Sequence, residues 1–156
     1  FGSRRWRTSR STWAFGPMLV IDWTRERRRI LLPLMVLRPF PATDLTGADA
    51  VALLDTGSSI SGITRRLAAQ LGLAGLGKRP LRSAQGEGQV ERYAFRIGLV
   101  ADEAGLAKPS FPFVFDEVIG IELANAFEFN ALLGMDILGQ CEFSMTRQGG
   151  CRLAFG

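Results

Sequence analysis

The sequence predicts one all-β or β-rich domain that carries one or two short helices. The chain has 156 residues, a length that suits one compact core better than two. Hydrophobic residues make up 47% of it and charged residues 22%, which is the composition of a globular protein. Short apolar stretches are separated by frequent glycines and prolines, a pattern that favours short strands joined by turns.

The first predicted strand covers residues 30–37, and Pro33 restricts it to a sheet edge or to an interrupted hydrogen-bond ladder. Residues 38–47 contain two prolines, an aspartate and a glycine, so they are predicted to form a loop. A buried strand over residues 50–54 then runs directly into the tripeptide Asp55-Thr56-Gly57.

A helix is predicted after this tripeptide. Ser61 can cap its first turn, and Gly72 can end it. Ile63, Leu67 and Leu71 recur every four residues, which places them on one helical face.

The second half of the chain again indicates short strands, with one further short helix. Hydrophobic alternation and turn residues predict the elements in chain order: a hairpin over 81–93 with a glycine-rich tip, a half-buried strand over 93–99, a strand around 111–115, a buried strand over 130–134, a short helix over 135–139, and a hairpin formed by 141–146 and 151–155.

Positive charge is concentrated at the start of the chain. Residues 1–29 hold eight arginines against two acidic residues, whereas the rest of the chain is mildly acidic. We expect residues 1–29 to be a peripheral basic extension and residues 30–156 to be the folded domain. Met18 is a plausible natural start, which would leave residues 1–17 outside the fold. A solvated terminus is the simpler interpretation of the arginines, and binding of nucleic acid or anionic lipid is the alternative.

No segment is long and apolar enough to predict a transmembrane helix. The apolar residues 14–21 are too short and too interrupted for a convincing signal peptide. Two cysteines, Cys141 and Cys151, are too few for a disulfide framework or a four-thiolate zinc site, although a single bridge between them stays open. A reducing compartment is the default for such a chain, and we expect a cytoplasmic protein.

The sequence contains no histidine. This excludes Ser-His-Asp and Cys-His catalysis and zinc sites with histidine ligands within one chain. Aspartate chemistry is not excluded.

The candidate chemistry lies in residues 53–59, Leu-Leu-Asp-Thr-Gly-Ser-Ser. A carboxylate at the end of a buried strand is costly unless it has a partner or a role. Gly57 lets the backbone turn and offers its N–H to Asp55, and the hydroxyl of Thr56 can lock the loop. An isolated tripeptide of this kind would more simply be an ordinary turn. Here, however, it follows a hydrophobic strand, precedes a helix and is matched downstream by a second strand that ends in glycine, Leu132-Leu133-Gly134.

In this order of motifs the chain resembles the retropepsin-like aspartic proteases, the single-domain relatives of retroviral proteases. The resemblance covers residues 30–155 and rests on the segments 53–59 and 131–138. It implies a β-barrel of the acid protease type, closed by dimerisation, and hydrolysis of peptide bonds without a metal or another cofactor.

The resemblance also implies roles for particular residues. Asp55 corresponds to the catalytic aspartate, in a loop completed by Thr56, Gly57 and Ser58. The family's flap, a lid that closes over the bound peptide, corresponds to the hairpin tip around Gln85, Gly86, Glu87 and Gly88. The hydrophobic pair and glycine at Leu132, Leu133 and Gly134 support the loop from beneath.

The mechanism of the family needs two carboxylates that share one proton. This chain offers one Asp-Thr-Gly, and Asp136 is better interpreted as a helix-start or salt-bridge residue than as the second catalytic group. The second aspartate is therefore expected from another copy of the chain in a C2 homodimer. By resemblance, the first strand and the closing hairpin over 141–155 form the dimer contact.

Ser58 stands where retroviral enzymes commonly have alanine. A hydroxyl at this position can donate a hydrogen bond to Asp55, which would favour an acidic pH optimum. Its alternative role is to cap the following helix.

Three interpretations of function are open at this stage. The first is a homodimeric aspartic endopeptidase with a peptide or protein substrate. The second is a peptide-binding module of the same fold that does not cut. The third is a nucleic-acid-associated protein derived from a transposable element, in which the basic residues 1–29 carry the function.

Overall fold

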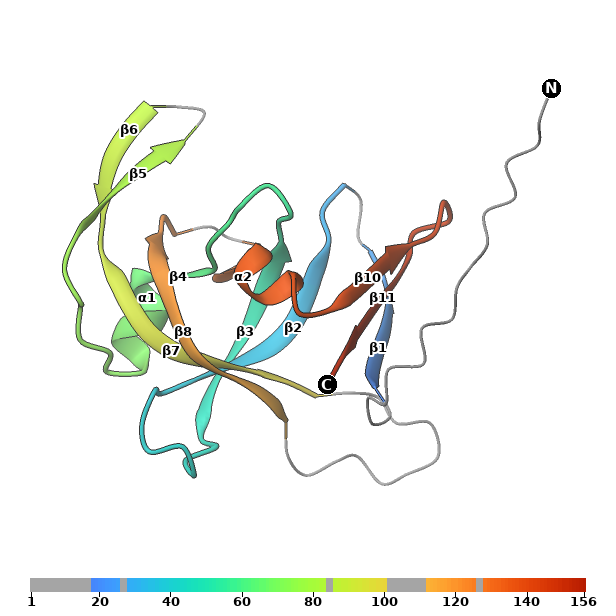
Figure 1. The fold of residues 1–156 in the computed structure, drawn as a ribbon, viewed down its shortest axis with the longest axis horizontal. Helices are drawn as coiled ribbons and strands as arrows, with labels where there is room; N and C mark the ends of the chain where they lie inside the picture. Colours follow the sequence, from blue (N-terminus) through green and yellow to red (C-terminus); the bar gives the residue numbers. More distant parts are fainter. Residues whose placement is uncertain (1–17, 26–27, 84–85, 101–111, 126–127) are drawn as a thin grey trace.

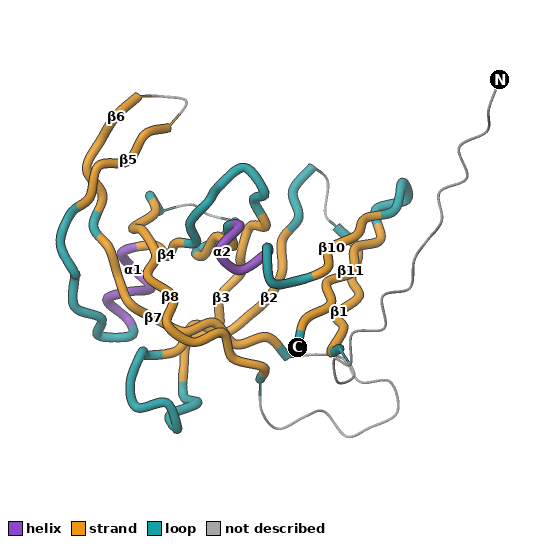
Figure 2. The backbone as a smooth tube through the Cα atoms, in the orientation of Figure 1, coloured by secondary structure: helices purple, strands orange, loops and turns teal. Residues whose placement is uncertain are grey.

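The computed structural model describes residues 18–25, 28–83, 86–100, 112–125 and 128–156 (Figures 1 and 2). The described chain is β-rich with two short helices, as the sequence predicts. Its strands are β1 (Leu19–Thr24), β2 (Leu31–Leu37), β3 (Gly47–Leu54), β4 (Gly62–Thr64), β5 (Arg79–Ser83), β6 (Gly86–Val90), β7 (Arg92–Leu99), β8 (Phe113–Leu123), β9 (Ala131–Leu133), β10 (Glu142–Met145) and β11 (Gly150–Phe155), and its helices are α1 (Arg65–Gln70) and α2 (Met135–Leu138).

Six strands form a closed barrel in the order β2-β3-β9-β4-β8-β7 (Figure 1). Along β3 the burial alternates, so that Ala48, Ala50, Ala52 and Leu54 are buried in the core. The barrel closes within one chain. The expectation that dimerisation closes it is therefore wrong, because the parallel pairs β3–β9 and β4–β8 supply the closure internally.

Pro33 is accommodated as the sequence predicts. It faces Val51 of β3. On its other side β2 pairs with β7 only from Met35 to Leu37, so Pro33 lies in the half of the strand that lacks this second ladder.

The remaining part of the fold includes a three-stranded sheet in the order β1-β11-β10. Strand β1 falls inside residues 1–29, which were expected to be peripheral, and for residues 19–24 this expectation is wrong. Leu19, Ile21 and Trp23 alternate along the strand and pack against the core, with Ile21 only 7% exposed. This alternation is short, and arginines lie on both sides of it, so the sequence alone does not distinguish it from a basic extension. Residues 1–17 lie outside the described residues.

The helix after the Asp-Thr-Gly segment begins later than predicted. Its N-cap is Thr64, whose Oγ1 accepts a hydrogen bond from the N–H of Leu67 at 3.3 Å. Ser61 does not cap it, and Ile63 lies in β4 instead. The reason is tertiary: residues 62–64 pair with β8 and β9, so the helix can start only after this short strand.

The long loop between β2 and β3 is organised by a buried cation. Arg96 is 2% exposed, and its guanidinium donates hydrogen bonds to the carbonyls of Arg38, Pro41, Ala42 and Asp44. A buried charge is tolerated when hydrogen bonds satisfy it, and here backbone carbonyls do so. The loop that the sequence predicts is therefore an ordered structure around one side chain.

Both cysteines are free, so the disulfide left open by the sequence is not formed. Burial raises the pKa of the Cys141 thiol to about 11, which keeps it protonated near neutral pH. Among the described residues, no helix has the length and hydropathy to cross a membrane.

If β1 is an integral strand, Ile21→Ala should lower the free energy of unfolding by about 2–4 kcal/mol, because it removes a buried side chain from the core. The exposed Thr24→Ala on the same strand is the control and should change it by less than about 0.5 kcal/mol. Urea denaturation measures both. Equal, small effects would contradict the assignment of β1 to the folded core.

Candidate active site

Asp55 lies directly after the last residue of β3. Strand β3 runs parallel to β9, with Leu53 opposite Leu132 and Leu54 opposite Leu133. The ladder continues one step further, since the N–H of Asp55 donates to the carbonyl of Leu133 at 3.0 Å. The fold thus brings together the two motifs on which the sequence analysis depends.

The backbone turns sharply at the carboxylate. The N–H of Gly57 donates to Oδ1 of Asp55 at 2.9 Å, and the N–H of Ser58 donates to the Asp55 carbonyl at 3.2 Å. A Cβ at position 57 would lie 3.1 Å from that Oδ1, so glycine leaves room for this contact. Asp55 is half-buried and Thr56 is exposed. The carboxylate is therefore oriented by its own loop but still accessible.

Ser58 does not donate to Asp55, which corrects that expectation. Its hydroxyl donates to the carbonyl of Ile60 at 2.8 Å and accepts from the N–H of Ile60 at 3.4 Å. A hydroxyl has one hydrogen to donate, and this one is used inside the loop. It does not cap α1 either, because Thr64 does. The Ser58 side chain therefore supports the loop through its two hydrogen bonds with Ile60.

Gly134 allows the segment after β9 to pass very close to the Asp55 loop. A Cβ at this position would lie 2.6–2.9 Å from three backbone atoms of Ile60, closer than real contacts allow. One residue later, the N–H of Met135 donates to the carbonyl of Ser58 at 2.8 Å. The predicted supporting role of this element agrees with the contact, and it is the backbone that gives the support.

A second contact between these segments was not visible in the sequence. Ser61 is fully buried; its N–H and hydroxyl both donate to the carboxylate of Asp136, at 3.0 and 2.7 Å. The Ser61 hydroxyl also accepts from the N–H of Gly134 at 3.0 Å. Asp136 lies in the first turn of α2, where its carboxylate also accepts from the N–H of Ile137. Its interpretation as a helix-start residue is confirmed.

Asn130 joins three strands next to this network. Its side-chain oxygen accepts from the N–H of Val51 at 2.8 Å, and its own N–H donates to the carbonyl of the same residue. Its carbonyl accepts from the N–H of Thr64. The sequence predicts that Asn130 lies in a strand but not that it has this role, because an asparagine before a short apolar strand does not indicate its partners.

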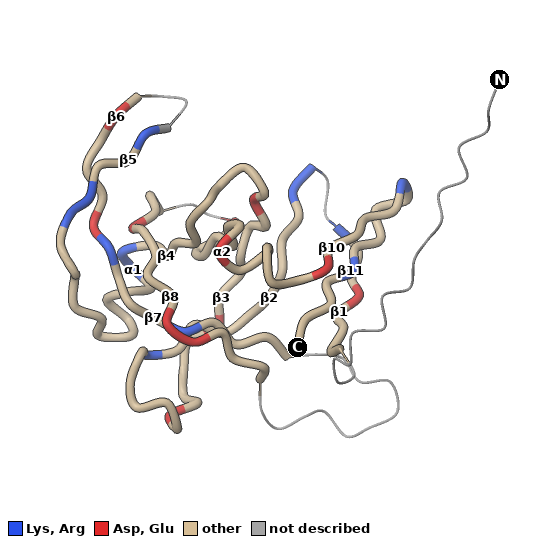
Figure 3. Tube along the Cα trace, in the orientation of Figure 1, with Lys and Arg blue, Asp and Glu red and all other residues tan. Residues whose placement is uncertain are grey.

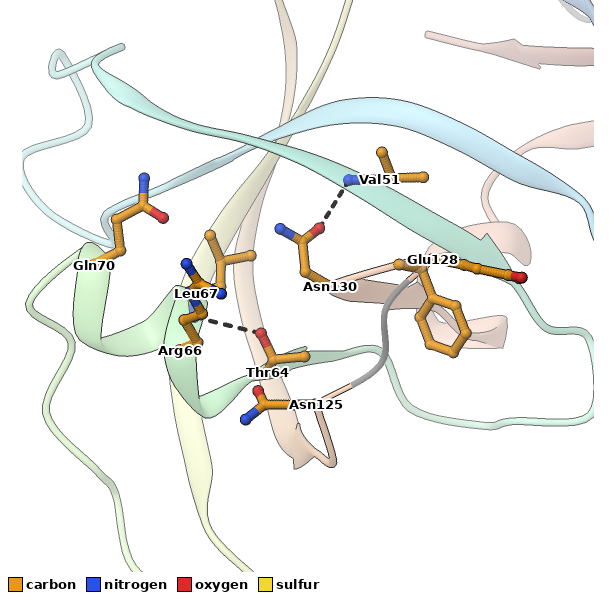
Figure 4. Close-up of a pocket in the computed structure, with 9 residues that line it drawn as sticks. Val51, Thr64, Arg66, Leu67, Gln70, Asn125, Glu128 and Asn130 are labelled. Atoms are coloured by element: carbon orange, nitrogen blue, oxygen red, sulfur yellow. Dashed lines mark hydrogen bonds between the residues drawn. The ribbon is translucent and has the colours of Figure 1, made fainter.

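A hollow of about 440 Å³ lies between α1, β3 and the segment before β9 (Figure 4). Its lining includes Val51, Thr64, Leu67, Glu128 and Asn130, and Asp55 is not part of it. Its size therefore says nothing about substrate binding at the aspartate.

Arg29 directly precedes Ile30, which contacts the end of β3. The N–H of Leu54 donates to the carbonyl of Ile30, which places the end of β3 beside residues 29–30. The guanidinium of Arg29 pairs with Glu128 and lies 5.8 Å from the ring centre of Phe129. This side chain is thus held by the segment before β9.

The segment predicted to be the flap lies in a hairpin of β5 and β6. Gly86, Glu87 and Gly88 lie in β6, whereas Gln85 is outside the described residues. The hairpin extends beyond the barrel, and in the same view the loop between β3 and β4 also rises above the barrel (Figure 1). Arg82 and Glu87 form an exposed ion pair across the two strands at 2.7 Å. The geometry is that of a projecting arm.

Within the described ranges, no group of three or more Asp, Glu, Cys and His side chains is arranged to hold a metal ion. The group of this site that can act as an acid or a base is the oriented, accessible carboxylate of Asp55.

We expect Asp136→Asn to destabilise the protein by about 1–3 kcal/mol, because an amide cannot accept both hydrogen bonds from Ser61 and also the one from Ile137 in the same geometry. The exposed Asp49→Asn is the matched control and should have little effect. Urea unfolding of both variants tests this. An Asp136 variant as stable as the wild type would show that the network contributes little.

Comparisons with known proteins agree with this geometry. A family model described as "Aspartyl protease" matches residues 42–137, more than half of the chain. Among solved structures, a retropepsin-like aspartic protease from Rickettsia conorii matches with a TM-score of 0.57 and 18% identity, covering 89% of this chain and 92% of that one. At this identity the likeness concerns the fold, and it confirms the barrel predicted from the sequence. The comparison with curated proteins gives no match.

Proposed function

Since this chain belongs to the aspartyl protease family, we propose that it is an endopeptidase whose catalytic residue is Asp55 and whose active form is a homodimer. The observation that carries the proposal is the placement of Asp55. Asp55 lies at the end of β3, where the N–H of Gly57 orients its carboxylate. The carbonyl of Leu133 and the close approach of Gly134 hold its loop in place.

The proposed reaction uses two aspartates that hold one proton between them. The ionised carboxylate takes a proton from a water molecule, whose oxygen adds to the carbonyl carbon of the peptide bond while the protonated carboxyl donates its proton to the carbonyl oxygen. The neutral gem-diol intermediate then collapses. One of its hydroxyls gives its proton to the ionised aspartate, the C–N bond breaks, and the leaving nitrogen takes up the proton of the other aspartate, so that the dyad again holds one proton. One chain offers one oriented Asp-Thr-Gly, so the second aspartate is Asp55 of another copy, related by a two-fold axis.

The sheet β1-β11-β10 is the proposed contact between the copies. Strands β1 and β10 lie at the two edges of this sheet, and an edge strand offers unpaired backbone groups to a further strand. The resemblance to the retropepsin-like family likewise implies that the closing hairpin, here β10 and β11, forms the dimer contact.

The hairpin of β5 and β6 is the proposed lid over the bound peptide. Its described residues are exposed or half-exposed, and it projects beyond the barrel, as a lid that closes on a substrate must. Gly86 and Gly88 keep its second strand free of side chains at two positions, which would let its backbone approach an extended peptide.

The intact geometry around Asp55 favours cleavage over binding without cleavage. The interpretation as a nucleic-acid-associated protein depends on the arginines of residues 1–29, most of which lie outside the described residues. The experiment that separates these functions is cleavage of a mixed peptide library with and without a transition-state-mimicking inhibitor of aspartic proteases.

Asp55→Asn should lower peptide cleavage by at least about 10²–10⁴-fold, because an amide cannot act as the base, while the thermal transition stays unchanged. Mixing equal amounts of wild-type and variant chains should then reduce the activity per wild-type chain to about half, since half of the wild-type chains pair with an inactive partner. A specific activity that is unaffected by mixing and by dilution would show that each chain holds a complete site.

Ser58→Ala should leave the pH dependence of cleavage unchanged. The rate profile of a dyad that must hold one proton is bell-shaped, and a side chain shifts it by bonding to the carboxylates. Because the Ser58 hydroxyl bonds to Ile60 instead, its loss should cost about 1 kcal/mol of stability without moving the bell. A pH–rate profile that moves toward neutral pH in this variant would instead support a hydrogen bond from Ser58 to Asp55, as the sequence suggests.

A further inference from the structure

The hairpin of β5 and β6 has little support of its own. Apart from the half-exposed Leu81 and Val90, its described side chains are exposed, and its register brings Leu81 opposite Gly88 rather than opposite another side chain. An isolated two-stranded ribbon of this kind is at best marginally stable in water. Its orientation must therefore be determined where it joins the barrel.

The joint on the β5 side is an exposed segment, residues 74–78, between α1 and the hairpin. Gly77 in this segment has φ +95°, a backbone conformation that favours glycine. An exposed segment that is rich in glycine has no fixed conformation of its own. Contacts with other parts of the chain must therefore fix its conformation.

Arg92 makes three hydrogen bonds to this segment. Its carbonyl accepts from the N–H of Leu76 at 2.9 Å, and its guanidinium donates to the carbonyls of Leu76 and Gly77, both at 3.3 Å. Arg92 is also the first residue of β7, directly after the hairpin. One side chain thus joins the chain entering the hairpin to the chain leaving it.

The barrel side of this clamp is firmly held. Arg92 pairs with Ile121 of β8, and the carbonyl of its neighbour Glu91 accepts from the N–H of Glu122 at 2.8 Å. Basic and acidic residues both lie at this base of the hairpin (Figure 3).

A further network fixes the same corner of the barrel. The Tyr93 hydroxyl donates to Glu122 at 2.7 Å, and Arg65 donates to the same carboxylate through two nitrogens. The hydrogen bonds from Arg65 and Tyr93 lower the pKa of Glu122. Burial and Glu122 raise the pKa of Tyr93 to about 12. These shifts favour an ionised Glu122 and a protonated Tyr93, the states that make these hydrogen bonds, at the corner of the barrel where the clamp is attached.

We propose that Arg92 is the positioning residue of the lid: its fork onto the carbonyls of Leu76 and Gly77 holds the hairpin in the direction from which it closes over a peptide. The inference rests on the proposed protease function and on the hairpin as its lid. Loss of the two hydrogen bonds of the guanidinium leaves the bond between the Leu76 N–H and the Arg92 carbonyl in place. The segment 74–78 can then change its orientation. The closed arrangement then becomes a smaller fraction of the free enzyme, and the apparent affinity for peptide falls by that fraction.

Steady-state cleavage tests the effect on the reaction. Arg92→Ala should raise KM about tenfold, the factor expected when two hydrogen bonds of ordinary net strength are lost, with kcat within about twofold. Arg92→Lys keeps the charge but not the fork and should recover only part of the affinity. Arg66→Ala removes an equal charge from the exposed face of α1 and serves as the control with unchanged kinetics.

Amide hydrogen exchange tests the clamp without using activity. In Arg92→Ala, residues 76–83 and 86–90 should exchange faster than in the wild type, while β3 and β9 keep their protection. If no variant of the chain cleaves peptides but this local change is seen, the clamp stands and the proposed function fails. If the wild type cleaves peptides and Arg92→Ala changes neither KM nor the exchange of the hairpin, the proposed function stands and the clamp is refuted.

Discussion

The parallel pairing of β3 with β9 is the constraint on which the rest of the structure depends. These two short strands are far apart in the sequence, and their ladder ends with the N–H of Asp55 on the carbonyl of Leu133. Parallel strands cannot be joined by a tight turn, so everything between them must form the connection. The helix α1, the projecting hairpin and the long pair β7–β8 all belong to that connection. The position of Asp55 is therefore a property of the whole barrel.

The same constraint explains why backbone contacts dominate around the aspartate. Gly134 approaches Ile60 too closely for any side chain, and Ser61 uses its N–H and its hydroxyl to bind Asp136 of α2. Buried polar groups must be paired, and here they pair with each other across the two segments. The loop that carries Asp55 is consequently held at both of its ends. The half-buried carboxylate of Asp55 nevertheless stays accessible.

Stability and function are divided between different parts of the molecule. The barrel closes within one chain, so a single copy can have a complete core, whereas it offers only one Asp-Thr-Gly carboxylate. The hairpin of β5 and β6 lies outside the core and is attached through hydrogen bonds of Arg92 to exposed carbonyls. Weak packing together with a small number of polar contacts at its base would let the hairpin move at little cost, as its proposed role as a lid requires.

The sequence by itself determined the β-rich class, the position of the Asp-Thr-Gly segment, its supporting glycine strand and the glycine-rich hairpin. Each of these is a local pattern: hydrophobic alternation, a carboxylate after an apolar strand, or glycines at a turn. It also indicated correctly that Asp136 belongs to a helix start, because an acidic residue is favoured in a first turn.

Only the tertiary structure decided which groups bind one another. Five serine and threonine hydroxyls follow Asp55 within ten residues, and the sequence offers no means of assigning their partners. In the fold, Ser58 binds Ile60, Ser61 binds Asp136, and Thr64 caps α1. Strand β1, which the arginines around it obscured, was likewise determined by β11, its partner at the far end of the chain. A hydrogen bond depends on which donor and acceptor the folded chain brings within about 3 Å, and residues distant in sequence become neighbours only when the barrel closes.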